Sequence, residues 1–132
     1  MVYTPEEKLR MDKLLEVFED YIAESQEMDI AYAPKTGYVW LVVAENADWF
    51  YFPVKGYDDL LEKLCSCMVM EEEERSVVSV GDYSMVDTQR PRELLSARLH
   101  RLDENRGYAL GKMEEYLARW SKQLACFMRT KL

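Results

Sequence analysis

The sequence YVWLVVAENADWFYFPV, residues 38–54, is the most apolar and most β-prone part of this chain. In residues 38–44 both alternating sets of side chains are apolar, which is typical of a strand that is central in its sheet or covered on both faces. The polar residues 45–48 predict a loop, and residues 49–54 predict the next strand. Pro53 withholds one backbone donor from that strand and favours a sheet edge. We therefore expect a hairpin at the centre of the fold.

A further strand is predicted before this hairpin. Apolar and polar or small residues alternate over residues 28–33, as they do in a strand with one buried face. Residues 34–37, PKTG, have the composition of a tight turn that ends in glycine. Together these segments predict a three-stranded antiparallel meander with residues 38–44 in the middle.

An N-terminal helix is predicted to cover this meander. Thr4 and Glu7 have the spacing of a capping box, and Pro5 suits the first helical position. Apolar residues then recur at spacings of three and four as far as Ile22, which makes one apolar stripe. The stripe should pack on the sheet.

The segment after the meander predicts a crossing helix and then a short strand. An apolar helical stripe begins at residue 57 or 58. Residues 71–74, EEEE, oppose the dipole at the C-terminal end of this helix, so we expect exposure or fraying there. Residues 75–80, RSVVSV, predict a fourth strand, and residues 81–84 predict a loop after it.

Residues 90–128 predict helix again, in one of two arrangements. Gly107 and Gly111 each cost about 1 kcal/mol inside a helix, which favours a break near residues 105–107 and therefore two helices. The apolar stripe nevertheless crosses that region without a change of phase, which favours one long helix. We expect the break, with the continuous helix as the alternative.

The length of 132 residues is that of one ordinary domain, and we predict a single α+β domain over residues 1–132. The net charge of −8 hides an asymmetry along the chain. Residues 1–87, an acidic α/β body, hold seven Lys and Arg against twenty Asp and Glu, whereas residues 88–132, a basic helical part, hold ten against five. Such asymmetry bears on the choice of partner rather than on the fold.

The location of the protein is predicted from the length of its apolar runs and the number of its cysteines. No apolar run approaches the ~20 residues that would span a bilayer, and the N-terminus opens into a charged helix rather than a signal peptide. The cysteines Cys65, Cys67 and Cys126 are odd in number, which fits reduced thiols better than a disulfide framework. We expect a cytoplasmic protein with no membrane partner.

The reactive residues form no motif that requires a particular chemistry. Cys65 and Cys67 lie two positions apart, so a helix would point them in nearly opposite directions, and His100 is the sole histidine. Adjacent carboxylates on a helix do not converge, and the scattered glycines match no phosphate-binding loop. We therefore predict no catalytic residue, no cofactor and no metal, and keep a carboxylate enzyme as a third alternative.

The aromatic hairpin has two interpretations, because helices on both faces would make it core, whereas an open face would make it a binding surface. The hypothesis we favour is a non-catalytic cytoplasmic protein-interaction module or inhibitor-type protein, with a homodimer among the expected states. It would act through its acidic body and its aromatic sheet. The candidate partner surface consists of Trp40, Trp49, Tyr51, Glu71, Glu72, Glu73 and Glu74.

The alternative hypothesis is an accessory protein that binds nucleic acid through its basic C-terminal helices. Pairs of basic residues one helical turn apart could lie along phosphates. The acidic body opposes this, because it would repel the same polymer, and a related variant is an acidic mimic of nucleic acid. The candidate nucleic-acid contacts are Arg98, Arg101, Arg119 and Lys122.

Overall fold

The computed structural model describes the backbone of residues 2–43, 48–80, 83–86 and 89–131, and the side chains of residues 2–43, 48–69 and 89–119. It is an α+β fold with five helices and five strands in these ranges. The chain divides into two compact units, Met1–Leu61 and Glu62–Leu132, which are described separately below. The prediction of a single domain stays a prediction.

The first unit begins with helix α1 (Pro5–Val17), which starts as the sequence predicts. The Thr4 hydroxyl accepts a hydrogen bond from the Glu7 N–H at 3.1 Å, and proline occupies the first turn. The predicted stripe is interrupted at Phe18, where the backbone leaves helical geometry before the short helix α2 (Glu19–Glu24). Phe18 is fully buried, so this break places a large aromatic side chain in the core.

The Glu7 side chain has a different role from the one that a capping box gives it. Its carboxylate accepts a hydrogen bond from the backbone N–H of Tyr57 at 3.4 Å, at the first residue of helix α3 (Tyr57–Ser76). A negative charge at the N-terminus of a helix is stabilised by the helix dipole. A Cβ atom at Gly56 would lie 2.8 Å from the same carboxylate, so a larger residue there would make the Glu7 side chain shift.

The predicted meander is confirmed. Strands β1 (Met28–Ala33), β2 (Gly37–Val43) and β3 (Trp49–Pro53) form an antiparallel sheet with β2 in the middle. The turn between β1 and β2 closes with a hydrogen bond from the Thr36 N–H to the Ala33 carbonyl at 3.1 Å. Gly37 follows with a φ of +81°, a left-handed conformation that glycine adopts without strain.

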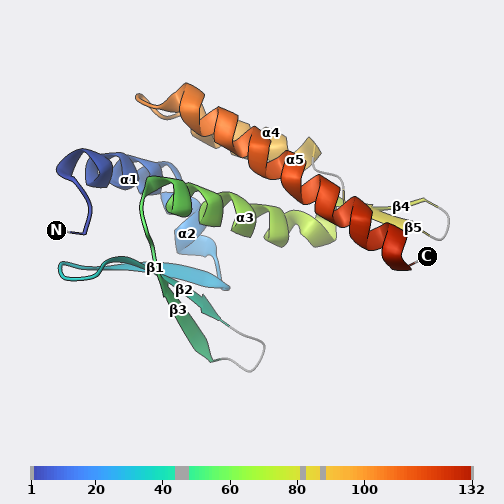
Figure 1. The fold of residues 1–132 in the computed structure, drawn as a ribbon, viewed down its shortest axis with the longest axis horizontal. Helices are drawn as coiled ribbons and strands as arrows, with labels where there is room; N and C mark the ends of the chain where they lie inside the picture. Colours follow the sequence, from blue (N-terminus) through green and yellow to red (C-terminus); the bar gives the residue numbers. More distant parts are fainter. Residues whose placement is uncertain (1, 44–47, 81–82, 87–88, 132) are drawn as a thin grey trace. The chain divides into compact units, whose positions relative to one another are not determined.

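Helices α1 and α2 lie on one side of this sheet (Figure 1). Trp40 on β2 marks the face of the sheet that is turned toward these helices, because only 3% of its surface is exposed. It is paired with Ile30 on β1 and with Phe52 on β3, so these residues lie on the same face. The Tyr38 hydroxyl, two residues from Trp40 on the same face, donates a hydrogen bond to Asp12 of α1. The core of the first unit consists of Tyr3, Met11, Leu14, Val17, Phe18, Met28, Trp40, Val54, Tyr57, Leu60 and Leu61.

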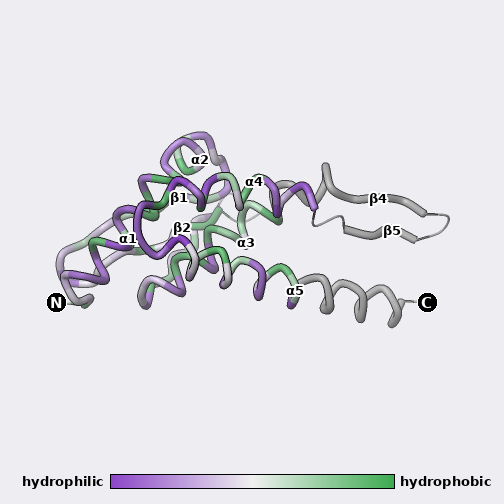
Figure 2. Tube along the Cα trace, turned by 90° about the horizontal axis from the view of Figure 1, so that it is seen from above, coloured by the Kyte–Doolittle hydropathy of each residue, from purple (hydrophilic) through white to green (hydrophobic). Residues whose placement is uncertain are grey.

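The second unit is built from the rest of α3, helix α4 (Gln89–Leu99) and helix α5 (Arg106–Lys131). Hydrophobic and hydrophilic stretches alternate along the described part of α5, as in an amphipathic helix (Figure 2). The buried hydrophobic side chains among the described residues of the second unit are Leu64, Cys65, Met68, Val69, Leu95, Leu99, Leu102, Ala109, Met113, Tyr116 and Leu117.

The predicted break between the C-terminal helices is confirmed, and the alternative of one long helix is wrong. Helix α4 ends at Leu99 and α5 begins at Arg106. Asn105 has a φ of 60°, a left-handed conformation that interrupts a right-handed helix and that asparagine tolerates better than most residues. The break therefore rests on Asn105 and not on the glycines, since Gly107 and Gly111 both lie inside α5.

Two details after the meander differ from the sequence-based expectation. Helix α3 does not end at residues 71–74 but continues to Ser76, which fits the high helix propensity of glutamate. The predicted fourth strand is β4 (Val77–Val80), but it pairs antiparallel with β5 (Tyr83–Val86) in a sheet of its own. The first residues of β5, at positions 83 and 84, lie where the sequence predicts a loop.

Candidate functional site

Strand β3 carries the most exposed aromatic side chains in the described part of the chain. Trp49, Phe50, Tyr51 and Phe52 are consecutive, and 55%, 53%, 72% and 51% of their respective surfaces are exposed. Single exposed apolar residues are common on proteins, but a contiguous apolar patch marks a binding surface or an aggregation site. We call these four residues, 49–52, the aromatic edge.

The aromatic edge extends over both faces of the sheet because neighbouring side chains of a strand point in opposite directions. Phe50 and Phe52 share the face of Trp40, but they lie on the outer strand and remain exposed. Trp49 and Tyr51 lie on the opposite face, beside Leu41. The aromatic edge is therefore apolar on both faces of the sheet.

The face of the sheet that carries Tyr51 is open. Its side chains on the central strand, Val39, Leu41 and Val43, are half-buried, and none of them is buried as Trp40 is on the inner face. Ala31 on the neighbouring strand is exposed. Of the two interpretations of the hairpin, an open face fits the outer side of the sheet, and the core lies on the inner side around Trp40.

Trp40 has to be removed from the candidate partner surface. Its side chain is buried in the core of the first unit, so a partner that binds the folded chain cannot reach it. Trp49 and Tyr51 of the predicted set are exposed, and the structure adds Phe50 and Phe52. Glu71, Glu72, Glu73 and Glu74 lie on α3, and their side chains are outside the described residues.

Tyr3 fixes the position of strand β3 through its hydroxyl group. The Tyr3 hydroxyl accepts a hydrogen bond from the Tyr38 N–H at 3.0 Å and donates one to the Val54 carbonyl at 2.5 Å. The hydroxyl group thus lies between the Tyr38 N–H and the Val54 carbonyl, which would be hydrogen-bonded to each other in an ordinary antiparallel ladder. The Val54 N–H completes the link by donating to the Tyr38 carbonyl at 2.9 Å. Burial raises the pKa of the Tyr3 hydroxyl above its ordinary value, so the group stays a donor near neutral pH.

The sequence gives no signal for this role of Tyr3, because a single tyrosine before a helix cap has no periodic pattern. Its neighbour Tyr38 lies with its ring centroid 6.3 Å from that of Tyr3, in a stacked arrangement. Burial and the hydrogen bond to Asp12 raise the pKa of the Tyr38 hydroxyl. Tyr3 before α1 and Tyr38 on β2 thus link the N-terminal segment to strands β2 and β3.

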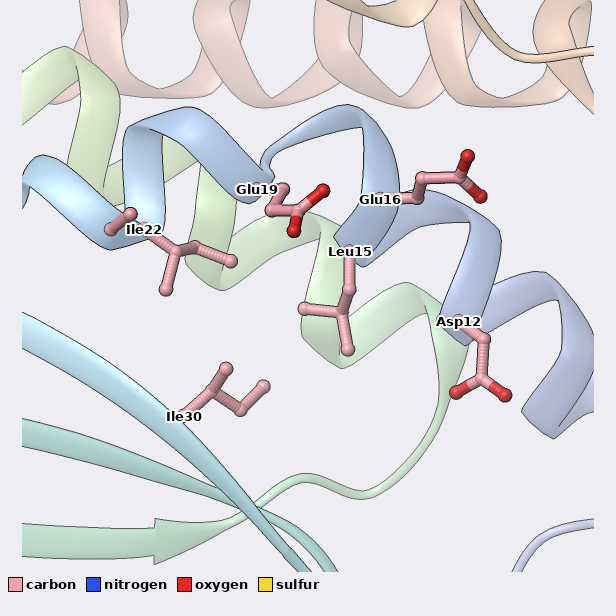
Figure 3. Close-up of a pocket in the computed structure, with 7 residues that line it drawn as sticks. Asp12, Leu15, Glu16, Glu19, Ile22 and Ile30 are labelled. Carbon is pink, nitrogen blue, oxygen red and sulfur yellow. The ribbon is translucent and has the colours of Figure 1, made fainter.

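A groove of about 470 Å³ lies between α1, α2 and β1. Leu15 and Ile22 point from the helices toward Ile30, which points up from the strand (Figure 3). Asp12 lies at one end, whereas Glu16 points away from Ile30 (Figure 3). The Asp12 and Glu16 carboxylates therefore do not converge on one point of this groove (Figure 3).

Asp12 is the carboxylate of this groove with the most contacts. One of its oxygens accepts a hydrogen bond from the Lys8 ammonium at 2.9 Å, and the other accepts one from the Tyr38 hydroxyl. Both oxygens thus take part in the packing of α1 on the sheet. We assign Asp12 a positioning role in the fold.

The predicted nucleic-acid contacts lie on several elements of the second unit. Arg98 is half-buried on α4, Arg101 is exposed in the connection to α5, and Arg119 forms an ion pair with Glu62 of α3. Lys122 lies on α5, and its side chain is outside the described residues. Another arginine of α4, Arg92, pairs with Glu114 of α5 at 3.2 Å. Acidic residues of the same unit thus neutralise part of the basic face.

The cysteines do not form a metal site with other ligands in the part of the chain that the structure describes. Cys65 is buried and Cys67 is half-buried, and neither is in a disulfide. Cys126 lies outside the described side chains. Within the same described residues, no helix is both long and apolar enough to cross a membrane.

The two described thiols should differ in reactivity. Burial, with a smaller effect from Glu62, raises the pKa of the Cys65 thiol from 9.0 to about 12. Because the thiolate is the nucleophile and Cys65 is buried, we expect iodoacetamide at pH 9 to alkylate Cys65 at least about tenfold more slowly than the half-buried Cys67. Peptide mass mapping measures both rates, and unfolding in urea should make them equal. Equal rates in the folded protein would contradict the burial of Cys65.

Comparison with known proteins gives no relative: no protein-family model, no curated protein and no solved structure matches this chain. The candidate site therefore rests on the geometry of the chain itself. In that geometry β3 is an exposed, aromatic and uncharged strand at the edge of a sheet, and the core lies on the side of the sheet that carries Trp40.

Proposed function

We propose that this chain is a non-catalytic, cytoplasmic protein-interaction module that binds its partner through the aromatic edge and the open face of the sheet beside it. The observation that carries the proposal is the exposure of four consecutive aromatic side chains, residues 49–52, on an outer strand. Aromatic residues are enriched where protein partners bind, because they bury a large area with few rotatable bonds.

The size of this surface supports the proposal. With about 200 Å² for each aromatic side chain, the exposed fractions of residues 49–52 leave roughly 450 Å² of aromatic surface in water. Burying that area would contribute about 11 kcal/mol at ~25 cal/mol per Å². Association costs roughly 4–15 kcal/mol in lost motional freedom, so the aromatic edge alone gives weak binding. A stable complex would also use the open face or the backbone of β3.

A cross-linking experiment in cells that express the protein tests this proposal. A photoreactive benzoylphenylalanine replaces Tyr51 in one variant and Leu9 in a control. Leu9 is an exposed apolar residue of α1 in the same unit, with 55% of its surface accessible. We expect a discrete cross-linked product from position 51 and none from position 9. The same pattern from both positions, or no product from either, would overturn the proposal.

A further inference from the structure

The two edges of the three-stranded sheet differ in how their backbone groups are used. On the β1 edge, the Asp29 carboxylate accepts a hydrogen bond from the Ile30 N–H at 2.8 Å. A side chain that accepts a hydrogen bond from an outward-facing N–H of an edge strand, and places a charge beside it, blocks the addition of another strand. The β3 edge has no charged residue between Asp48 and Lys55. Only the β1 edge is therefore protected by a charge, whereas on the β3 edge Pro53 removes a single outward donor.

The direction of the backbone groups of β3 follows from its pairing with β2. The Val54 N–H donates to the Tyr38 carbonyl at 2.9 Å, so the backbone groups of Val54 point toward β2. Because this direction alternates along an antiparallel strand, the groups of residues 50 and 52 also point toward β2. Those of Trp49, Tyr51 and Pro53 point outward. Pro53 has a carbonyl but no N–H, so the outward pattern is two donors and three acceptors.

We propose that a second copy of this chain pairs with β3 along this outward edge, antiparallel and centred on Tyr51, so that the two sheets join into one. The proposal rests on the proposed function and names its partner. In this register Tyr51 faces Tyr51 of the second copy, Phe50 faces Phe52, and Trp49 faces Pro53. Each of the four outward N–H groups in the pair then has a carbonyl partner. The arrangement is self-complementary, as a two-fold symmetric interface must be.

The number of facing β3 residues and the charges at the strand ends favour this register over its neighbours. Centred on Tyr51, all five residues of one β3 strand face all five residues of the other. A shift by two residues in either direction would leave two residues of each strand facing segments outside β3. The centred register also brings the start of one strand, Asp48, beside the end of the other, Lys55, so charges of opposite sign lie at each end. A shift toward the N-terminus would instead place Asp48 opposite Phe52.

The expected affinity is low. The aromatic surface of two copies is roughly 900 Å², close to the ~1,000 Å² below which interfaces are weak or transient. The cross-strand pairs of Phe50 with Phe52 and of Tyr51 with Tyr51 add aromatic contacts on both faces of the joined sheet. We expect a dimer with a dissociation constant in the micromolar range, in exchange with the monomer.

Sedimentation of the purified full-length chain from about 1 µM to about 1 mM tests self-association. Tyr51→Ala removes the side chain and keeps the outward N–H, whereas Tyr51→Pro removes both. An outer strand accepts proline where its N–H faces solvent, so both variants should keep the fold and melt within a few degrees of each other. We expect Tyr51→Pro to weaken the dimer at least about tenfold more than Tyr51→Ala, because one substitution removes two symmetric hydrogen bonds. Equal weakening would overturn the strand pairing.

Disulfide trapping tests the register independently. Facing residues with outward backbone groups have Cα atoms about 5.5 Å apart, which a disulfide can span. With diamide as the oxidant, which takes up the two hydrogens released by two thiols, Tyr51→Cys should cross-link to itself. Trp49→Cys should not cross-link to itself, but should cross-link to Pro53→Cys when the two variants are mixed. Mass mapping separates these products from any at the native cysteines, and self-linking of Trp49→Cys would overturn the register.

The outcomes distinguish this inference from the proposed function. A monomer at every concentration, together with a cross-link from position 51 to a different protein in cells, would overturn self-pairing and leave the protein-binding role intact. A monomer without any cross-link in cells would overturn both. A dimer of the purified chain that forms the expected disulfides, and a cellular cross-link of twice the chain's mass, would establish both.

Discussion

Replacing Gly37 with alanine should lower the free energy of unfolding by about 2–4 kcal/mol. Gly37 has a φ of +81°, which costs an alanine about 1 kcal/mol or more. A Cβ atom there would also lie 2.7 Å from the Tyr3 hydroxyl and 2.8 Å from two carbons of its ring. The ring cannot withdraw without breaking the hydrogen bonds to Tyr38 and Val54. Urea unfolding followed by tryptophan fluorescence measures the loss.

Two controls separate the clash from other effects of the substitution. Gly111→Ala places a methyl group in open space inside α5, so it should stabilise the protein by about 0.5–1 kcal/mol. In a Tyr3→Ala background the clash is absent, so Gly37→Ala should cost only the backbone strain. The double-mutant cycle should therefore show coupling of about 1 kcal/mol or more. An equal cost in both backgrounds would show that Tyr3 does not constrain Gly37.

The order of strands could be predicted from the sequence because the relevant signals are local. Alternation over residues 28–33, the turn that ends in Gly37, and two apolar sets in residues 38–44 each depend on near neighbours. Pro53 identified the outer strand for the same reason, since a missing donor is a property of one residue. These signals placed β2 in the middle and β3 at an edge, as observed.

The exposure of the aromatic edge could not be predicted in this way. A row of four aromatic residues has the same composition whether helices cover it or not, so its exposure depends on where α1 and α2 end relative to β3. The hydroxyl of Tyr3 between β2 and β3 and the carboxylate of Glu7 at the start of α3 are also contacts between distant segments. Periodicity within a segment carries no information about them.

Truncating Trp40 to alanine should destabilise the protein by about 3–5 kcal/mol, the range for removing a large aromatic side chain from a core. Trp40 is buried at the centre of β2, on the sheet face where Tyr38 reaches α1. The cavity would lie between the sheet and helices, where both are held by other contacts and can close only in part. Chemical unfolding measured by circular dichroism gives the difference, since the substitution removes a fluorescent reporter.

The matched control is Trp49→Ala, which removes the same side chain from β3. Because 55% of Trp49 is exposed at the edge of the open face, its truncation should change the free energy of unfolding of the monomer by about 1 kcal/mol or less. It should instead weaken self-association, since Trp49 faces Pro53 of the second copy in the proposed pairing. One tryptophan would then support the fold and the other the interface. If the two truncations cost equal stability at a concentration where the chain is monomeric, the sheet has no open face, and the aromatic edge is part of the core.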